Sequence, residues 1–531
     1  MKKNIIFVTG GTCSGVGKGV ILASIGKLLE GLGFSIKIVK IDPYLNQDAG
    51  TMNPQEHGEV WVTKSGQETD TDGGTYFRFL KTEEDNNRII TAGYIIQEVF
   101  NKERNGIFQG ETVRINPHII HEIKNQITQG DDCHFTLVEI GGTIGEMELN
   151  PFLLAIKDFQ HDDNFTTMHL NVALTTTNHN NEIKIKPIET LFNFLPYGLT
   201  VDMEIIRLNR PINEKEIKKI KQYSYVKNII NLEKADSIYE VPLLLQKKNV
   251  HEIILDHFQI EPLKNHICLS DFEKILQIKN NPHMRVIKAL IIGKYSQSLD
   301  NYKSIDEALL HAATHLHLKI SVHLFNLELP SEEIKNYDLV IVAGGFGVNL
   351  TAEIMQHIRY IRQNNIPVLL ICFGLQLALI EIARNVIKIT DATSMEFSDT
   401  GSPIICLVDE KHNPRNNNFG GTLRVGAFPV YLNSTSIVYN TYKKYERIQS
   451  NNFITEKFRH RYWINKNFKT IFEKYSIHFS FNNGPSGEDL FGFELDTHLH
   501  KFFVGVQFHP ELSSNIYKPH PLFIAILEKV L

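Results

Sequence analysis

A glycine-rich turn between an apolar run and a helix-forming segment constrains the fold of this chain more than any other feature. The run NIIFVTG, from residue 4, leads into the turn GTCSGVG and then into KGVILASIGKLLEGLG, which starts at Lys18. A second apolar run, SIKIVKID, starts at residue 35. Strand, helix and strand in this order form a βαβ unit with parallel strands. The first part of the chain is therefore predicted to be an α/β domain with a doubly wound parallel sheet.

The turn itself predicts a phosphate-binding loop. Backbone N–H groups in a glycine-rich turn at a helix N-terminus point toward phosphate oxygens, and Lys18 can reach the outer phosphates. The common pattern G-x-x-x-x-G-K-[ST] would place glycine at Thr12 and a hydroxyl at Gly19. A tight turn that binds nothing is the alternative. The strand and the helix on the two required sides favour the phosphate loop.

Because no hydroxyl follows Lys18, a magnesium ion needs other ligands. Mg²⁺ takes oxygen ligands and often uses only one or two protein carboxylates. The segment ETDTDGGTY carries Asp70 and Asp72, and Glu139 ends a buried run at the rim where α/β sheets bind ligands. A solvated acidic loop is the alternative for Asp70. We predict that Asp72 and Glu139 hold the magnesium.

The second half repeats the α/β pattern after a change in composition. Residues 268–285 mix charged residues with Asn-Asn and Pro, which predicts a linker between domains at 1–267 and 286–531. YDLVIVAGGFG, from Tyr337, and IPVLLICFG, from Ile366, are predicted strands that each end in a glycine-bearing turn.

Three side chains in the second half predict a nucleophile with its base. Cys372 lies between an apolar strand and a helix, in a sharp turn that favours a thiolate. The turn AGGFG could supply oxyanion-binding N–H groups. VGVQFHPE supplies His509 as the base and Glu511 as the group that orients it. An inert buried cysteine is the alternative for Cys372 alone.

Composition excludes several classes of protein. The formal net charge of −5 argues against general nucleic-acid binding. The five cysteines form no C-x-x-C pair, so neither a disulfide framework nor a zinc site is indicated. The longest apolar stretch, VLLICFGLQLALI, is shorter than a bilayer span. A cytoplasmic protein without a membrane partner is the expectation.

Several motifs resemble those of the CTP synthase family. They are GGTCSGVGKG, KIDPYLNQDAGTMNP, HGEVWVT, ETDTDGGTYFRF, VEIGGTIGEMELNPFLLAI and ADSIYEVPLLL, and the Cys372 and His509 motifs resemble class I glutamine amidotransferases. The resemblance implies an N-terminal amidoligase and a C-terminal α/β glutaminase domain. It implies that ATP phosphorylates O4 of UTP and that ammonia from glutamine then attacks C4. Mg²⁺, GTP as an allosteric activator, CTP as a feedback inhibitor and a homotetramer (a dimer of dimers) are further implications.

The resemblance also implies roles for individual residues. Lys18 and Lys40 would stabilise the transferring phosphoryl group. The ATP-binding residues would be Gly15, Val16, Gly17, Lys18, Gly19 and Val20, with Asp72. The UTP- or CTP-binding residues would be Ser14, Glu146, Met147, Glu148, Lys184, Ile185, Lys186, Pro187, Ile188, Glu189 and Lys219. The glutamine-binding residues would be Gly345, Phe373, Gly374, Leu375, Gln376, Glu396 and Arg461.

Three of these segments have plainer alternatives. The lysine-rich runs around Lys184 and Lys219 could be ordinary solvated faces, and FRHRYWIN could pass for an RNA contact. A guanidinium fork fits a carboxylate, which favours Arg461 as a glutamine ligand.

The chain departs from the family at several positions. Ala343 replaces a common Pro, and the segment DEKHNPRNNNFGGTLRVG, a lid associated with GTP activation, is short. Arg114 and Glu189 replace usual Gln residues, and Leu154 replaces a carboxylate. We hypothesise that Arg114 and Glu189 compensate each other across a subunit contact.

Two other functions compete with a CTP synthase. One is another P-loop amidotransferase that amidates a carboxylate, for instance on a corrin precursor. The other is a nucleotide-binding structural polymer. The DPYLNQDAGTMNP and EIGGTIGEMELNP motifs argue against the first. The second is disfavoured because the residues predicted to perform the chemistry are all present: Lys18, Asp72, Glu139, Cys372, His509 and Glu511.

Overall fold

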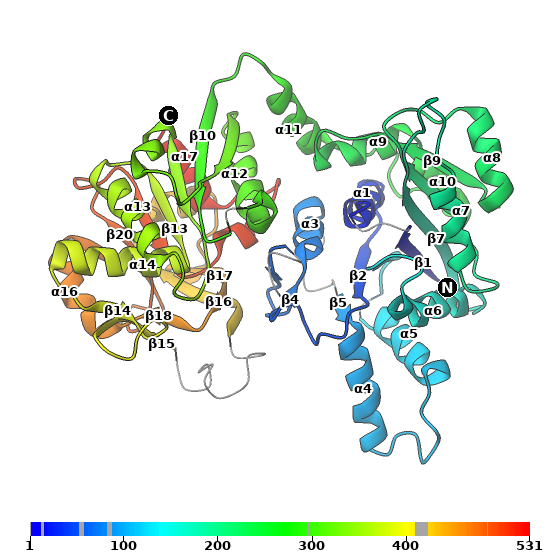
Figure 1. The fold of residues 1–531 in the computed structure, drawn as a ribbon, viewed down its shortest axis with the longest axis horizontal. Helices are drawn as coiled ribbons and strands as arrows, with labels where there is room; N and C mark the ends of the chain where they lie inside the picture. Colours follow the sequence, from blue (N-terminus) through cyan, green and yellow to red (C-terminus); the bar gives the residue numbers. More distant parts are fainter. Residues whose placement is uncertain are drawn as a thin grey trace. The chain divides into compact units, whose positions relative to one another are not determined.

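The chain forms two compact units. The computed structural model describes residues 2–11, 15–52, 58–81, 88–130, 132–224, 226–295, 297–408, 423–485 and 487–531 (Figure 1). The first unit contains Met1–Ala49 and Thr75–Leu276, and the second contains Gly50–Gly74 and Gln277–Leu531. The second unit thus includes a segment from the first part of the sequence. The domain limits at 267 and 286 stay a prediction.

The first unit is built on a seven-stranded parallel sheet with the order β5-β2-β6-β1-β7-β8-β9. All residues of β2 and β6 are buried, as expected for parallel strands that are covered on both faces. The strands are β1 (Lys3–Gly10), β2 (Ile36–Asp42), β5 (Arg88–Thr91), β6 (Phe135–Ile140), β7 (Phe165–Leu174), β8 (Met203–Arg207) and β9 (Asn228–Leu232).

Helices cover both faces of this sheet. On one face α4, α5 and α6 bury an apolar core, and on the other α1 packs against the sheet and against α9 and α10. The helices are α1 (Lys18–Gly31), α4 (Ala92–Arg104), α5 (Ile120–Thr128), α6 (Asn150–Gln160), α7 (Lys186–Phe194), α8 (Glu214–Ser224), α9 (Val241–Lys247) and α10 (Val250–Phe258). Two more, α3 (Thr71–Phe79) and α11 (Ser270–Asn280), each contain a boundary between the units. The predicted parallel βαβ fold is confirmed.

The winding direction changes between β1 and β6, which are neighbours in the sheet. β1 leads through α1 to β2 on one side, and β6 leads through α6 to β7 on the other. At such a point the two connections diverge and leave a crevice at the carboxyl ends of the strands, where α/β sheets bind ligands. The phosphate turn after β1 and Glu139 in β6 are thus placed at the expected binding edge.

The second unit contains a nine-stranded mixed sheet with the order β11-β10-β12-β13-β21-β20-β19-β16-β17. The strands from β11 to β21 are parallel, and the pairs from β21 to β17 are antiparallel. The strands are β10 (Val286–Ile292), β11 (Lys319–Leu324), β12 (Leu339–Val342), β13 (Val368–Ile371), β16 (Arg424–Leu432), β17 (Phe453–His460), β19 (Ile477–Asn482), β20 (Leu490–Leu495) and β21 (Phe503–Val506).

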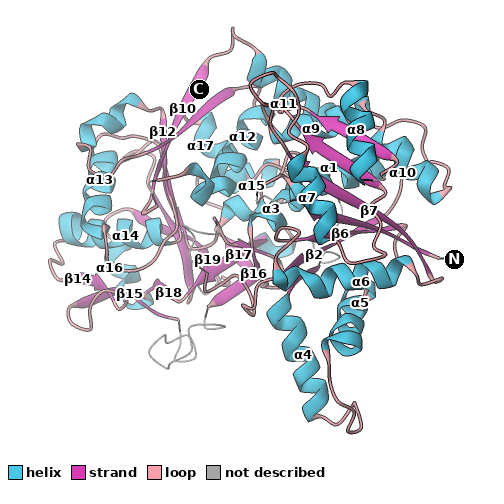
Figure 2. Cartoon of the chain, turned by 45° about the vertical axis from the view of Figure 1, so that its right-hand side comes forward, coloured by secondary structure: helices cyan, strands magenta, loops and turns pink. Residues whose placement is uncertain are grey.

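Helices flank this second sheet on both faces, with α12 and α17 on one face and α13 and α14 on the other (Figure 2). The helices are α12 (Lys303–His315), α13 (Thr351–Gln363), α14 (Phe373–Ile382), α15 (Tyr439–Lys444), α16 (Lys469–Glu473) and α17 (Pro521–Glu528). Smaller sheets are formed by β14 (Ala392–Ser394), β15 (Ser402–Leu407) and β18 (Tyr462–Ile464), and by the hairpin of β3 (Trp61–Val62) and β4 (Glu68–Thr69). Within the described ranges, no helix combines the length and the apolar character that a membrane crossing requires.

A buried polar ladder crosses three strands of the first sheet. Thr9, Asn171 and Glu204 are register partners on β1, β7 and β8. The Thr9 hydroxyl donates to Asn171 Oδ1 (3.1 Å), and Asn171 Nδ2 donates to Glu204 Oε1 (2.8 Å). Glu204 is fully buried, and its Oε2 has no hydrogen-bond partner among the described residues. Burial raises the pKa of Glu204 to about 8, so the carboxyl is protonated at neutral pH.

This ladder predicts a pH-dependent stability. A carboxyl whose pKa rises on folding binds more protons in the folded state, so the free energy of unfolding falls as pH rises from about 4.5 to about 8. Glu204→Gln keeps the shape and removes the titration. We expect the variant to be more stable than the parent at pH 8, by on the order of a few kcal/mol, and equally stable near pH 4. Urea unfolding at both pH values measures this, with exposed Glu214→Gln as the control. An equal difference at both pH values would contradict the expectation.

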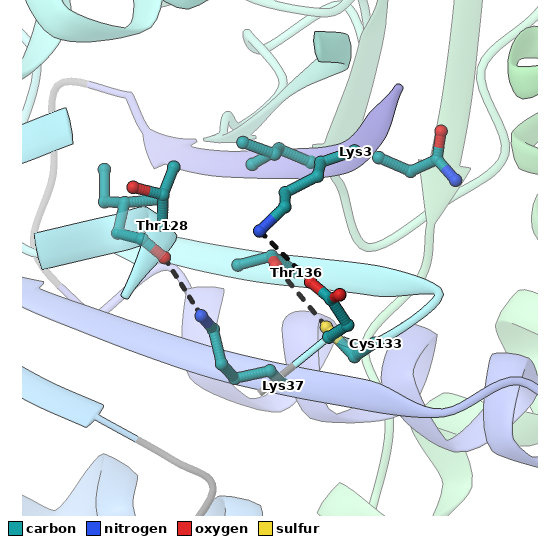
Figure 3. A pocket seen from close by; sticks show the side chains of 9 residues that line it. Lys3, Lys37, Thr128, Cys133 and Thr136 are labelled. Carbon is teal, nitrogen blue, oxygen red and sulfur yellow. Dashed lines mark hydrogen bonds and ion pairs between the residues drawn. The ribbon is translucent and has the colours of Figure 1, made fainter. Parts of the chain in front are cut away.

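A small cavity lies at the opposite, amino end of the first sheet. Lys3, Lys37, Cys133 and Thr136 line it, and Figure 3 shows their side chains. Lys37 Nζ donates to the carbonyls of Ile127 (3.1 Å) and Gln129 (2.8 Å). The cavity holds about 10 Å³, which is close to the smallest volume that accommodates one water molecule. Its size and its place at the amino ends of the strands separate it from the ligand-binding edge.

Candidate active site

Cys372 occupies a sharp turn between β13 and α14 in the second unit. Its backbone has φ 51° and ψ −100°, an uncommon conformation for a residue with a side chain. The turn also needs a glycine, because a Cβ at Gly374 would lie 2.5 Å from the Val342 carbonyl oxygen. Cys372 is 5% exposed and precedes the first turn of α14, whose N–H groups have no partner within the helix. Cys372 thus occupies a strained turn at a helix N-terminus, a position in which nucleophilic cysteines are found.

His509 and Glu511 lie beside this turn. His509 Nδ1 and Glu511 Oε1 are 2.7 Å apart. A Cβ built on Gly344 would approach both His509 Cε1 (3.0 Å) and Cys372 Cβ (3.9 Å), so the ring and the cysteine border the same glycine. Burial alone would lower the pKa of His509, but the Glu511 carboxylate and the neighbouring Cys372 outweigh it and hold the pKa well above its usual value. The environment thus favours a protonated imidazole beside the sulfur.

A cavity of about 100 Å³ opens onto these residues. Gly344 and Gly345 from the loop after β12 form one wall, and the hairpin segment contributes Glu59 and Val60. The lining residues are Glu59, Val60, Tyr295, Asn301, Tyr302, Ile305, Gly344, Gly345, Phe346, Cys372, Arg459, His509, Glu511 and Leu512.

Lys294 organises the loop after β12, and no sequence motif had pointed to this residue. Its ammonium group donates to the carbonyls of Phe346 (2.7 Å) and Gly347, and lies 4.4 Å from the centroid of the Phe373 ring. Burial lowers the pKa of Lys294 to about 8. Glu396 accepts a hydrogen bond from the Gly347 N–H (2.6 Å), and burial raises the pKa of Glu396 although Lys294 and Arg461 oppose this shift. The predicted glutamine ligands Glu396 and Arg461 are thus electrostatic neighbours.

Gln376 lies behind the nucleophile. Its Nε2 donates to the Tyr462 carbonyl (2.9 Å) and to Gln507 Oε1 (3.2 Å), and Gln507 Nε2 donates to Cys372 Sγ (3.3 Å). Gln376 and Gln507 are both buried. Gly374 and Leu375 are buried in the same turn of α14. This geometry makes Gln507 a direct neighbour of the sulfur. Gln507 belongs to the motif VGVQFHPE, from which only His509 and Glu511 were predicted as site residues.

The phosphate turn of the first unit joins β1 to α1. Gly15 and Gly17 have φ of 67° and 84°, values that favour glycine. Lys18 Nζ donates to the Gly142 carbonyl, which follows β6 (2.8 Å). Arg207, from the end of β8, donates to the Val16 carbonyl (2.7 Å) and so fixes the turn from outside it. Ser14 lies outside the described residues, Gly19 is buried and Val20 is half-buried.

The two predicted magnesium ligands lie in different units. Glu139 is 1% exposed, Lys40 Nζ lies 3.0 Å from its Oε1, and the Tyr76 hydroxyl donates to its Oε2. Asp72, at the start of α3, belongs to the second unit, and its N–H donates to Asp70 Oδ1 (3.0 Å). Glu139 is the second-last residue of β6. Its hard oxygen atoms at the carboxyl end of β6 fit Mg²⁺.

Most of the predicted UTP-binding residues follow β6 and β7, the two strands that flank β1 in the sheet. Glu146, Met147 and Glu148 are exposed, and Glu146 accepts hydrogen bonds from the Thr143 N–H (3.0 Å) and hydroxyl (2.5 Å). In the second group, Lys184 and Lys186 are exposed, Pro187 and Glu189 are half-buried, and Ile185 and Ile188 are buried. Lys219 is exposed on α8. The hypothesis that Glu189 pairs with Arg114 concerns a subunit contact and stays a prediction.

Fold and site together define a class of protein: a glutamine amidotransferase of the cysteine–histidine–glutamate type, joined in one chain to a parallel-sheet unit with a phosphate turn. The family model described as glutamine amidotransferase class-I matches residues 297–529, and the one described as CTP synthase N-terminus matches residues 4–260. The chain belongs to the CTP synthase family.

Two relatives of nearly equal length agree with this assignment. A CTP synthase of Hydrogenobaculum is 38% identical, covering 98% of this chain and 97% of its own. A CTP synthase of Sulfolobus acidocaldarius is 38% identical, covering 98% of each chain. Among solved structures, the glutaminase domain of a Trypanosoma brucei CTPS with bound acivicin is 27% identical, covers 46% of this chain and 93% of its own, and has a TM-score of 0.41. The family predicted from the sequence motifs is confirmed.

Proposed function

We propose that the chain converts UTP to CTP, using ATP and ammonia released from glutamine. The observation that carries this proposal is the cavity of the second unit, in which Cys372, His509 and Glu511 meet in a chain of this family. An assay with UTP, ATP, Mg²⁺ and either glutamine or an ammonium salt tests it through the absorbance change of CTP. The absence of product with both nitrogen sources would refute the proposal.

Glutamine hydrolysis follows from the geometry around Cys372. The thiolate attacks the carbonyl carbon of the glutamine side chain, and N–H groups from the Gly345 loop and from Phe373 stabilise the oxyanion. His509, oriented by Glu511, gives its proton to the leaving ammonia. Water then cleaves the thioester with His509 as the base, which releases glutamate and restores the thiolate. Glu396 and Arg461 would bind the amino and carboxylate groups of glutamine.

Amination takes place in the first unit. The phosphoryl group of ATP passes to O4 of UTP, ammonia attacks C4, and phosphate leaves. Lys18 and Lys40 stabilise the negative charge of the transferring group, and residues 15–20 bind ATP. Asp72 and Glu139 would hold Mg²⁺, which neutralises phosphate charge when bound.

The magnesium proposal predicts a loss that does not depend on the nitrogen source. Asp72→Asn and Glu139→Gln should each lower amination by roughly 10²-fold or more with either glutamine or ammonium, because the phosphoryl charge is less well neutralised. Steady-state rates at several Mg²⁺ concentrations measure this, and glutamine hydrolysis by Glu139→Gln should persist. Asp158→Asn, on the exposed surface of α6, is the control. Near-parental ammonia-dependent rates at limiting Mg²⁺ in both variants would contradict the assignment.

Regulation and assembly belong to the same proposal. The residues after β6 and β7, with Ser14 and Lys219, would bind UTP and the inhibitor CTP in a homotetramer. GTP would activate glutamine hydrolysis. The segment associated with that activation is short in this chain, so strong stimulation is not implied. Most of this segment lies outside the described residues. A cytoplasmic location also stays a prediction.

A further inference from the structure

The hairpin of β3 and β4 lies in a segment that the family model assigns to the N-terminal part of CTP synthases, yet the structure groups it with the second unit. Its contacts are specific. The Ala427 N–H of β16 donates to the Lys64 carbonyl (2.8 Å), and Gly66 packs so closely on β16 that a Cβ there would lie 2.8 Å from the Val425 carbonyl oxygen. The hairpin therefore extends the surface of the β16–β17 pair.

Two residues of β17 connect this hairpin to the catalytic pair. β17 is the last strand of the nine-stranded sheet, and carbonyls along it accept hydrogen bonds from catalytic residues. The Lys457 carbonyl accepts from the His509 N–H (2.8 Å), and the Arg459 carbonyl accepts from Cys372 Sγ (3.7 Å). The backbone of β17 thus contacts both the nucleophile and its base.

The side chains of the same two residues bind the hairpin. Along a strand, residues two apart share a face, and Lys457 and Arg459 lie opposite the core residue Phe458. Lys457 Nζ lies 4.5 Å from the centroid of the buried Trp61 ring. Arg459 Nε donates to Glu68 Oε1 (2.6 Å), and its Nη2 donates to the Gly50 carbonyl (3.2 Å). The Glu68 side chain is only 8% exposed, against 23% for Arg459, so the carboxylate of this charged pair is largely shielded from solvent.

We propose that Glu68 is a positioning residue for glutamine hydrolysis, acting through Arg459. The ion pair with Glu68 sets the position of Arg459, and Arg459 presents its carbonyl to the Cys372 thiol and its side chain to the cavity wall. The Trp61 ring packs against the Lys457 side chain, and the Lys457 carbonyl accepts a hydrogen bond from the His509 N–H, so Trp61 supports His509 through Lys457. Glu68 precedes Asp70 and Asp72 by two and four residues, so one short segment carries a proposed metal ligand and a support of the glutaminase site. The proposal rests on the proposed function.

Glu68→Gln tests this role, because it keeps the size of the side chain and removes its charge. Small displacements of a reacting group cost up to about 10²-fold in rate, so we expect kcat for glutamine hydrolysis to fall about tenfold with KM changed less than twofold. Alkylation of Cys372 by iodoacetamide, followed by peptide mass spectrometry, should slow as well. Ammonia-dependent amination reports whether the variant remains folded and should stay within about twofold of the parent.

A matched control and a coupling measurement separate positioning from general stability. Glu381→Gln removes the charge of another buried carboxylate in the second unit, which pairs with Arg362 (2.7 Å) and contacts neither Cys372 nor His509. It should leave the kcat of glutamine hydrolysis unchanged. In a double-mutant cycle with Glu68→Gln and Arg459→Gln, the second substitution should add little to the first. Glu68→Asp, which keeps the charge, should recover part of the lost rate.

Three results would overturn the proposal. They are a parental kcat and alkylation rate in Glu68→Gln, additive effects in the cycle, or an equal loss in Glu381→Gln. If Glu68→Gln does not fold, Glu68→Asp and Arg459→Lys carry the same test. Measurements on the parent enzyme separate this proposal from the proposed function. A parent that does not hydrolyse glutamine refutes the proposed function. The alkylation rates of the parent and of Glu68→Gln still report whether Glu68 positions Cys372.

Discussion

Replacing Cys372 with alanine is expected to abolish CTP synthesis from glutamine and to leave synthesis from ammonium salts close to the parental rate. The thiolate is the only group in the proposed mechanism that attacks glutamine, and added ammonia bypasses that step. The loss should exceed about 10³-fold, the range seen when a catalytic nucleophile is removed. Parallel assays with glutamine and with ammonium chloride measure it.

Cys406→Ala provides the control for this experiment. Cys406 is a partly buried thiol of the same unit, on β15, and the mechanism gives it no role. The control should retain both activities. If Cys372→Ala loses both activities while its circular dichroism spectrum stays parental, Cys372 does more than release ammonia and the proposed separation of the two reactions fails.

Lys18→Ala should eliminate amination with either nitrogen source. Lys18 leaves the phosphate turn with its ammonium group 2.8 Å from the Gly142 carbonyl, at the β1–β6 crevice. Removing a positioned cation from a phosphoryl transfer site costs roughly 10³-fold in rate. Rates of CTP formation with saturating ammonium give the size of the loss.

Measuring glutamine hydrolysis by Lys18→Ala distinguishes a specific loss of amination from unfolding of the variant. Lys18→Ala should still hydrolyse glutamine, because Cys372, His509 and Glu511 belong to the other unit. Lys264→Ala, which removes an exposed lysine of the first unit, should behave as the parent does. Residual amination above about a tenth of the parental rate would show that Lys18 is not a major contributor to phosphoryl transfer.

Local sequence patterns predicted much of the fold and many residues of both candidate sites. The strand, turn and helix around Lys18 form over short distances along the chain, and the same holds for the turn at Cys372, where Gly374 meets a close backbone contact. The periodicity of buried residues and the positions that require glycine can both be recognised in a short segment of sequence. His509 and Glu511 were predictable because they stand two residues apart after an apolar strand.

Long-range contacts account for what the sequence patterns missed. Arg207 acts on the turn at Val16 from the end of β8, and Lys294 acts on Gly347 from the end of β10. Each is a single basic residue near the end of a strand, without a motif around it. The role of Glu68 depends on Arg459, which lies 391 residues away. No local periodicity encodes such a pairing, because it depends on the order in which distant strands assemble.

That separation has a consequence for how the protein is made. On a ribosome that adds about 5–20 residues per second, 391 residues take roughly 20–80 s. During this time Trp61 and Val62, both buried in the finished structure, have no β17 to pack against. An isolated two-stranded hairpin is marginally stable in water. All strands of the first sheet are synthesised by Leu232, at the end of β9, so this sheet can fold while the apolar hairpin still lacks the strand against which it packs.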